Sequence, residues 1–414
     1  MSTDFVNMLY LFGASATGKE IKTQYCQNLS KIRKLALSQE VWDVVYAGVR
    51  EKIATGEITV PPEVYARLEK NFMSNVAMNI RRVEFNLGTL RRLEEKGIKC
   101  CVLKGTTVAR LYAMPEARIS SDIDILIDAA NEKQTVEILE GLGYRCENRA
   151  KHDHHMKAFH EIGGLLEVHV ALHSVPTNDI ILDDEIRYNE EFMLLDNGVY
   201  SLGVNDTLTY LSAHLIKHLI NDATGVRQMM DLLLYMKAYE SQIDWDKYNY
   251  LMKKLGYDNL IAVVKGIGVK YFGMEFDDAI TQGSGLEELL DDCEIGGAFG
   301  YGEKDRAQFY DMYTKRRSGK SPLQHLLYRL FTAERSLFSL LFPPARAIKE
   351  RFAYVQRYPI LLPVGWAHRF LDIFLKTSGK VKADENEESR VKNNMLERRM
   401  KMVEKLGMLK NGEN

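Results

Sequence analysis

The spacing of apolar residues predicts helices along the first quarter of the chain. Between residues 28 and 98, apolar positions recur every three or four residues, which is the period of one helix face. Pro61–Pro62 favours a helix start, because proline is well tolerated in the first helical turn. We therefore expect an N-terminal helical region over residues 1–97.

After Gly97 the helical spacing gives way to short apolar runs. Ile98–Leu103 (IKCCVL) is typical of a buried strand, and Gly105 precedes a short helical segment, TTVARLYA. Ser121–Asp128 (SDIDILID) alternates strictly, which places its isoleucines on one face of a strand and Asp122 and Asp124 on the other. A helix is expected next, ended by a glycine.

A hairpin is predicted farther along the chain. The runs HMKAFHEI and LLEVHVAL flank a Gly163–Gly164 turn. In the second run Glu167 and His169 share one face of the strand, and the apolar residues share the other. From about Asp206 the spacing is helical again. The expected fold class is therefore α+β: a small mixed sheet over about residues 98–200, flanked by N-terminal and C-terminal helical regions.

Acidic residues dominate the polar face of this predicted sheet. Asp122 and Asp124 lie two residues apart on one strand and point the same way. Glu167, from another strand, completes a cluster that repels itself unless cations lie between the carboxylates. Mg²⁺ prefers such oxygen ligands, and two such ions can hold the attacking and leaving oxygens of a phosphoryl transfer.

A glycine turn and basic residues accompany the acidic cluster. Gly105 at a strand-to-helix turn allows backbone N–H groups to approach a phosphate. Lys104 lies beside it, and Arg118 precedes the acidic strand. The order of glycine turn, DxD strand and later acid favours phosphoryl transfer, whereas an exposed acidic strand edge is the alternative.

These motifs resemble a known superfamily. VLKGTTVARLYAMPEARISSDIDILID followed by LLEVHVAL is similar to nucleotidyltransferases with the DNA polymerase β-type catalytic fold, and more narrowly to the bacterial family described as uncharacterised nucleotidyltransferases. The H-x-x-K-H pattern and a later aspartate of that family match His214, Lys217, His218 and Asp231. The resemblance spans about residues 65–270.

The resemblance implies roles for individual residues. Asp122 and Asp124 would be metal ligands and catalytic residues with Glu167, and two Mg²⁺ ions are expected, with Mn²⁺ as a substitute. The implied nucleotide-binding residues are Lys104, Gly105, Thr106, Arg118 and Lys217. Thr106 stands where the superfamily has Ser or Gly, and its hydroxyl can still bond a phosphate. His169 either orients a carboxylate or faces solvent.

The implied reaction moves a nucleotidyl group from a nucleoside triphosphate to a hydroxyl acceptor and releases pyrophosphate. The acceptor is left open among a sugar, another small molecule, a protein and RNA. One alternative is a toxin-like transferase that acts on tRNA. Another is a non-catalytic nucleotide-binding protein in a polysaccharide-assembly system. The helix with His214 and His218 either contacts the triphosphate or packs between domains.

The expected organisation has four parts. They are the N-terminal helical region (1–97), the nucleotidyltransferase catalytic core (98–204), a helical domain that packs on the core (205–314) and a basic aromatic helical lobe with a charged tail (315–414).

Two further motifs suggest other sites. Gly13–Glu20 (GASATGKE) is one residue from a phosphate-binding loop, but Glu20 replaces the hydroxyl residue that binds Mg²⁺. We interpret this segment as a flexible leader. The second motif is a group of histidines in His152–His155, together with His160. Histidine can bind zinc, but the spacing here favours a polar loop near the mouth of the active site.

The charge pattern adds one candidate surface. Lys plus Arg is 55 and Asp plus Glu is 57, which excludes a uniformly basic chain. Lys315–Lys380 nevertheless holds thirteen basic and three acidic residues among aromatic ones. Three interpretations of this lobe stay open: it packs within the protein, it binds an anionic membrane surface, or it binds RNA or another acidic partner. Five irregularly spaced cysteines and a poor secretory signal favour the cytoplasm, with a peripheral position at the inner membrane surface as an option.

Overall fold

The computed structural model of the protein describes most of the chain. The described residues are 1–120, 122–147, 149, 155–172, 192–195, 198–221, 224–276, 283–298, 300–318, 358, 361–368 and 387–409. Contacts divide the chain into one unit of Met1–Arg317 with Arg398–Asn414, and a second unit of Ser318–Glu397. Most of the basic lobe expected over Lys315–Lys380 lies outside the described residues. The division into four parts stays a prediction.

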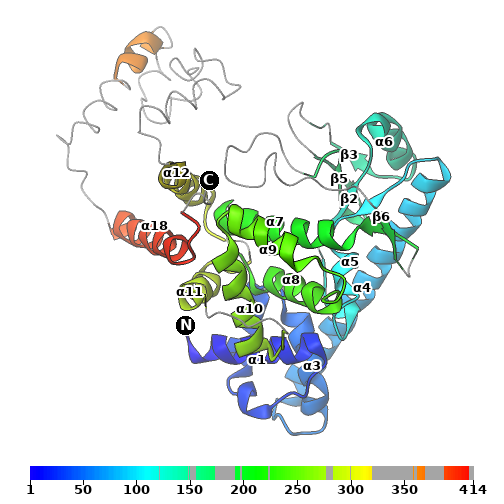
Figure 1. Ribbon diagram of the computed structural model, residues 1–414. Coiled ribbons are helices and arrows are strands. Elements are labelled where there is room, and N and C mark those ends of the chain that lie inside the picture. Colours follow the sequence, from blue (N-terminus) through cyan, green and yellow to red (C-terminus); the bar gives the residue numbers. More distant parts are fainter. Residues whose placement is uncertain are drawn as a thin grey trace. The chain divides into compact units, whose positions relative to one another are not determined.

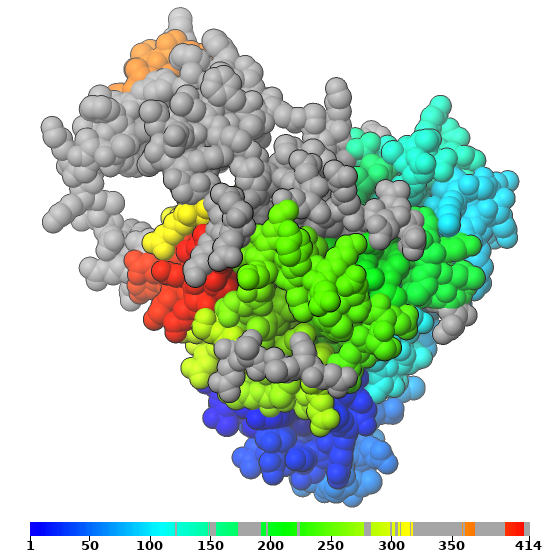
Figure 2. Space-filling model, viewed as in Figure 1, coloured from blue at the N-terminus to red at the C-terminus, as the bar shows by residue number. Residues whose placement is uncertain are grey.

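The N-terminal region is helical, as its spacing predicts. Its elements are α1 (Thr3–Thr17), η1 (Thr23–Cys26), α2 (Leu29–Ser38), α3 (Trp42–Ala54) and α4 (Pro62–Glu95). The long helix α4 begins at the second of the two prolines and extends from α3 to the sheet (Figure 1). In the space-filling view, the N-terminal helices (blue) lie against the green segment that includes α10 (Asp258–Phe272) (Figure 2).

The expectation of a flexible leader at the N-terminus is wrong. Phe5, Met8, Leu9 and Phe12 lie on one face of α1 and are fully buried, because their spacing gives this helix an apolar stripe. Gly13 permits close approach to α10, since a Cβ at this position would lie 2.4 Å from the Cα of Phe272. The glycine of the loop-like motif is therefore a packing contact inside a helix.

A seven-stranded mixed sheet forms the centre of the described fold, which confirms the α+β class. The strand order is β3-β4-β5-β2-β1-β7-β6. The strands are β1 (Cys101–Val102), β2 (Asp122–Leu126), β3 (Arg145–Cys146), β4 (His155–His160), β5 (Gly164–His169), β6 (Phe192–Leu194) and β7 (Tyr200–Leu202). Short helical elements between them are α5 (Thr106–Ala109), η2 (Pro115–Ala117), η3 (Ala129–Asn131) and α6 (Glu132–Gly141).

Strict alternation in β2 and β5 separates an apolar face from an acidic one. On the apolar face, Ile123 and Ile125 of β2 join Leu166 and Val168 of β5 in one buried cluster. Residues of α4 and α6 complete this cluster, so these two helices cover the apolar face of the sheet. The predicted faces of both strands are confirmed, and the acidic side chains lie on the opposite face.

Helices follow the sheet, as predicted. They are α7 (Val204–Asn221), α8 (Val226–Ala238), α9 (Trp245–Lys254), α10, α11 (Leu286–Gly296), α12 (Glu303–Ser318) and α18 (Glu387–Lys405). Helix α8 contacts α5, α7 and α10, and so joins the sheet region to the N-terminal helices. Within the described part of the chain, every helix is too short or too polar to cross a membrane. All five cysteines carry free thiols.

Candidate active site

The parallel pairing of β2 with β5 brings the predicted carboxylates together. In this register Asp124 lies directly opposite Glu167, and Asp122 lies two residues earlier on the same face of β2. His169 Nε2 lies 3.1 Å from Asp124 Oδ1 and 3.9 Å from a Glu167 oxygen. One ligand atom each of Asp124, Glu167 and His169 lies within 4.8 Å of the others, so this group can hold a metal ion.

Lys104 contributes a positive charge to this cluster. It follows β1, and its Nζ atom lies 3.5 Å from Asp122 Oδ2 and 3.3 Å from Asp124 Oδ2. The same Nζ lies 3.4 Å from Nε2 of His214 on α7. The ammonium therefore partly neutralises two carboxylates that would otherwise repel each other.

The surroundings of Asp124 and Glu167 shift the pKa values of these two carboxyl groups in opposite directions. Burial favours the neutral form of Asp124, but the Lys104 ammonium and the hydrogen bond with His169 outweigh it and lower the pKa of Asp124. Partial burial and the neighbouring Asp124 charge raise the pKa of Glu167. Glu167 is therefore the carboxyl of this pair that takes up a proton more readily.

The turn at Gly105 has the backbone conformation that the sequence suggested. Its φ of +79° lies in the region that favours glycine, and the chain then enters α5. Ser120 and Asp122 face this turn, since a Cβ at Gly105 would lie 3.9 Å from the Ser120 hydroxyl and 3.7 Å from the Asp122 carbonyl oxygen. Thr106 follows Gly105 and lines a largely apolar cavity of about 250 Å³ beside α4, and the wall of this cavity also includes Arg118 and Ser120.

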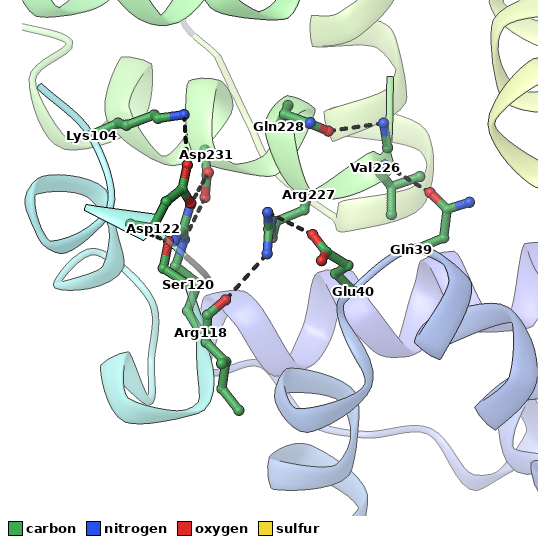
Figure 3. Close-up of polar contacts among 12 residues, drawn as sticks. Gln39, Glu40, Lys104, Arg118, Ser120, Asp122, Val226, Arg227, Gln228 and Asp231 are labelled. Atoms are coloured by element: carbon green, nitrogen blue, oxygen red, sulfur yellow. Dashed lines mark hydrogen bonds and ion pairs between the residues drawn. The ribbon is translucent and has the colours of Figure 1, made fainter. Parts of the chain in front are cut away.

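A second cavity, of about 180 Å³, opens next to the carboxylates. The charged residues and histidines that line this cavity come from the sheet region, from α7 and α8, and from the link between α2 and α3. They are Glu40, Lys104, Arg118, Asp122, His214, His218, Arg227 and Asp231. We call this space the acidic-strand cavity. Figure 3 shows Lys104 pointing toward Asp122, with Arg118 and Asp231 beside them.

Arg118 lies in this cavity wall as part of a buried ion pair. Its Nε lies 3.1 Å from Asp231 Oδ1, its Nη2 contacts Asp231 Oδ2, and Tyr112 donates to Asp231 Oδ1 at 2.7 Å. Burial opposes the charge of Asp231, but Arg118 outweighs this effect and lowers the pKa of Asp231. Nη1 of Arg118 has no hydrogen-bond partner among the described residues. Asp231 therefore fixes the guanidinium, and this Nη1 atom is itself buried.

Comparison with known proteins identifies the family. The family model described as "Uncharacterised nucleotidyltransferase" matches residues 26–265, which is more than half of the chain. The chain belongs to this family. Searches of curated proteins and of solved structures return no significant match. The family resemblance inferred from the sequence is confirmed, and the match includes the acidic strands, the glycine turn and both sides of the acidic-strand cavity.

The remaining predicted residues lie less centrally. Lys217 is exposed on α7, outside the lining of the acidic-strand cavity, although its charge helps to lower the pKa of His155 and of His214. Burial and the Lys104 ammonium are the larger causes for His214, whose pKa falls well below its ordinary value. A nucleotide contact by Lys217 stays a prediction.

The predicted histidine loop is only partly described. Residues 152–154 lie outside the described residues. His155 begins β4 opposite His169, and its Nε2 lies 4.0 Å from Glu167. Burial and the neighbouring His169 lower its pKa to about 4, so His155 is neutral near pH 7. His160, at the other end of β4, stacks on Phe85.

Sequence patterns did not reveal several residues of this candidate site. One of them is Tyr112, which supports Asp231. Glu40 and Arg227 pair with each other across the acidic-strand cavity although 187 positions separate them. The sequence did offer one indication for Arg227. It lies one helical turn before Asp231 and on the same face of the same helix.

Proposed function

We propose that this protein is a divalent-metal-dependent nucleotidyltransferase that moves a nucleotidyl group from a nucleoside triphosphate to a hydroxyl acceptor. The observation that carries the proposal is the register of β2 and β5, which sets Asp124 against Glu167 with Asp122 on the same face. A glycine turn and three cationic side chains, those of Lys104, Arg118 and Arg227, border the adjoining cavity.

The donor set fits a hard divalent cation. Carboxylate oxygens are the ligands that Mg²⁺ prefers, and a neighbouring imidazole nitrogen is also compatible with Mn²⁺. Asp122, Asp124 and Glu167 would hold the metal, with two Mg²⁺ ions as the proposed complement and His169 as the residue that orients Asp124. Bound metal would supply positive charge to the triphosphate and acidify the acceptor hydroxyl.

The chain's own groups have distinct tasks in the proposed reaction. The acceptor oxygen forms a bond to the α-phosphorus, the bond from that phosphorus to the bridging oxygen breaks, and pyrophosphate leaves with the electron pair. Glu167, which lies opposite Asp124 across the two paired strands, would accept the hydroxyl proton. Lys104, the Gly105–Thr106 turn and the Arg118 guanidinium bind phosphate oxygens, since Lys104, Gly105 and Arg118 line the acidic-strand cavity.

Turnover of labelled nucleotides tests the proposal. Purified protein is incubated with each labelled nucleoside triphosphate, Mg²⁺ and cell extract, and the label is followed into RNA, protein or small molecules. We expect the double variant Asp122→Asn with Asp124→Asn to lose at least about a hundredfold in turnover, since electrostatic stabilisation of the reacting phosphate is lost. The exposed Asp128→Asn, which affects only a cap of η3, is the matched control. Unchanged turnover in the double variant would contradict the proposal.

The acceptor and cellular position are separate parts of the proposal. Label on tRNA would favour the toxin-like alternative, and label on a sugar would favour a role in polysaccharide assembly. Binding of nucleotide without any transfer would favour the non-catalytic alternative. For the lobe at Lys315–Lys380, co-sedimentation with anionic vesicles and gel shift with RNA separate a peripheral membrane position in the cytoplasm from an acidic macromolecular partner.

A further inference from the structure

A third cation faces the acidic-strand cavity from α8. Arg227 lies in the first turn of this helix, and one guanidinium nitrogen lies 2.8 Å from Glu40 Oε2. Its Nη1 donates to the carbonyl oxygen of Ile119 at 3.2 Å. Figure 3 shows the guanidinium between Glu40 and the segment that carries Arg118. The side chain is therefore held at the wall of the cavity, beside the predicted phosphate-binding groups.

Glu40 is held in position by its neighbour in the link between α2 and α3. Gln39 is fully buried, its amide donates to the carbonyl oxygen of Cys293 at 2.5 Å, and its side-chain oxygen accepts from the Val226 backbone N–H at 3.0 Å. Glu40 itself has a φ of +55°, a left-handed conformation that is uncommon for residues other than glycine. The link therefore fixes a carboxylate against Arg227 at some conformational cost.

The two arginines of the cavity, Arg118 and Arg227, differ in how firmly their carboxylate partners hold them. Side-chain exposure is 5% and 10% in the Arg118–Asp231 pair, which is also joined by two contacts. Exposure is 15% and 25% for Arg227 and Glu40. Water and solutes reach the second pair more readily, so an incoming anion can displace Glu40 from Arg227 at lower cost than it can displace Asp231 from Arg118.

We propose that Arg227 binds phosphate oxygens of the nucleoside triphosphate and that Glu40 competes with them for its guanidinium. This inference rests on the proposed function, because it assigns the triphosphate to the same cavity. A planar guanidinium can bind two phosphate oxygens at once. The Glu40 carboxylate lies where such an oxygen would bind, and its charge repels the incoming phosphates.

Opposite effects of two substitutions test this competition. The probe is inorganic tripolyphosphate with Mg²⁺, measured by isothermal titration calorimetry, because it carries no base. We expect Arg227→Ala to weaken binding at least about tenfold, as a charge-assisted contact is lost. Glu40→Gln is expected to strengthen binding about twofold to fivefold, since a partly exposed ion pair no longer opposes it. The double variant should gain much less from Glu40→Gln than the wild type does, because the competition for the guanidinium is gone and only the repulsion by the Glu40 charge is relieved.

Arg50 and Glu69 provide the matched control. They form another partly exposed ion pair, and Glu69 has the same 25% side-chain exposure as Glu40. Neither residue lines the acidic-strand cavity. Arg50→Ala and Glu69→Gln are expected to leave tripolyphosphate affinity unchanged, and thermal unfolding monitors the stability of every variant. Arg227→Lys, which keeps the charge, should recover part of the lost affinity.

The outcomes separate this inference from the proposed function. If the wild-type protein binds tripolyphosphate while Arg227→Ala binds equally well, the assignment of Arg227 is overturned and the proposed function stands. If Glu40→Gln weakens binding, the pair supports the fold instead of competing with phosphate, and the inference is also overturned. If the wild-type protein binds neither tripolyphosphate nor any nucleoside triphosphate, the proposed function fails and this inference fails with it.

Discussion

Removing Asp231 should destabilise the protein far more than removing an exposed partner of another arginine. The Asp231 side chain is 10% exposed, and it accepts from Arg118 and from Tyr112. Asp231→Ala would leave a buried guanidinium and a buried hydroxyl without their common acceptor. Breaking a buried ion pair from one side costs about 3–5 kcal/mol, so we expect a loss of this size in the free energy of unfolding.

Urea unfolding measures the effect. Glu132→Ala is the control, because Glu132 also accepts two contacts from an arginine, Arg149, but has 27% side-chain exposure. This control should lose at most about 1 kcal/mol. Replacing both members of the buried pair, in Arg118→Met with Asp231→Leu, should recover much of the stability lost by Asp231→Ala, since apolar residues need no counter-ion.

The acid dependence of stability provides a second measure. Because the pKa of Asp231 is lowered in the folded protein, its contribution is complete well above its unfolded pKa of about 3.9 and is lost as pH falls through the folded pKa. Asp231→Ala should therefore differ most from the wild type near neutral pH, and the difference should shrink in acid. Equal losses for Asp231→Ala and Glu132→Ala at pH 7 would refute the role given to burial.

Two further predictions concern packing and charge. Gly13→Ala should lower the free energy of unfolding by about 1–3 kcal/mol because its Cβ would overlap the Phe272 backbone, whereas Gly88→Ala, in an open position of α4, should raise it by about 0.5–1 kcal/mol. Thermal unfolding compares them, and equal effects would contradict the packing described for α1. Lys104→Met should bind Mg²⁺ about threefold or more tightly in calorimetry, because the ammonium no longer competes for Asp122 and Asp124. Weaker Mg²⁺ binding by this variant would show that Lys104 supports the metal site instead.

Local patterns predicted the strands and the acidic face of the site. Alternation in DIDIL and LLEVH determines which side chains share a face, because successive residues of a strand point to opposite sides. The spacing of Asp122 and Asp124 required no knowledge of distant residues. The pairing of Asp124 with Glu167 depended on strand order, which local alternation leaves open.

Other features depended on contacts between distant parts of the chain. The small residues at the start of the Gly13–Glu20 motif resembled a loop, but up to Thr17 they continue a helix whose apolar stripe, beginning at Phe5, is buried by neighbouring helices. The Arg118–Asp231 pair joins residues 113 positions apart, and nothing in the spacing around either residue names its partner. Such pairs follow from the packing of α8 beside the sheet region, which periodicity alone does not predict.

The link that carries Gln39 and Glu40 determines where a working fragment can begin. A fragment trimmed to the sheet and the helices after it would lack Glu40, which forms one wall of the acidic-strand cavity. It would also lack the Gln39 side-chain amide, which anchors the start of α8. The family match begins at residue 26, upstream of this link, and extends beyond Arg227. A minimal expression fragment should therefore keep the early helices, and chimeras between relatives should exchange this link together with the beginning of α8.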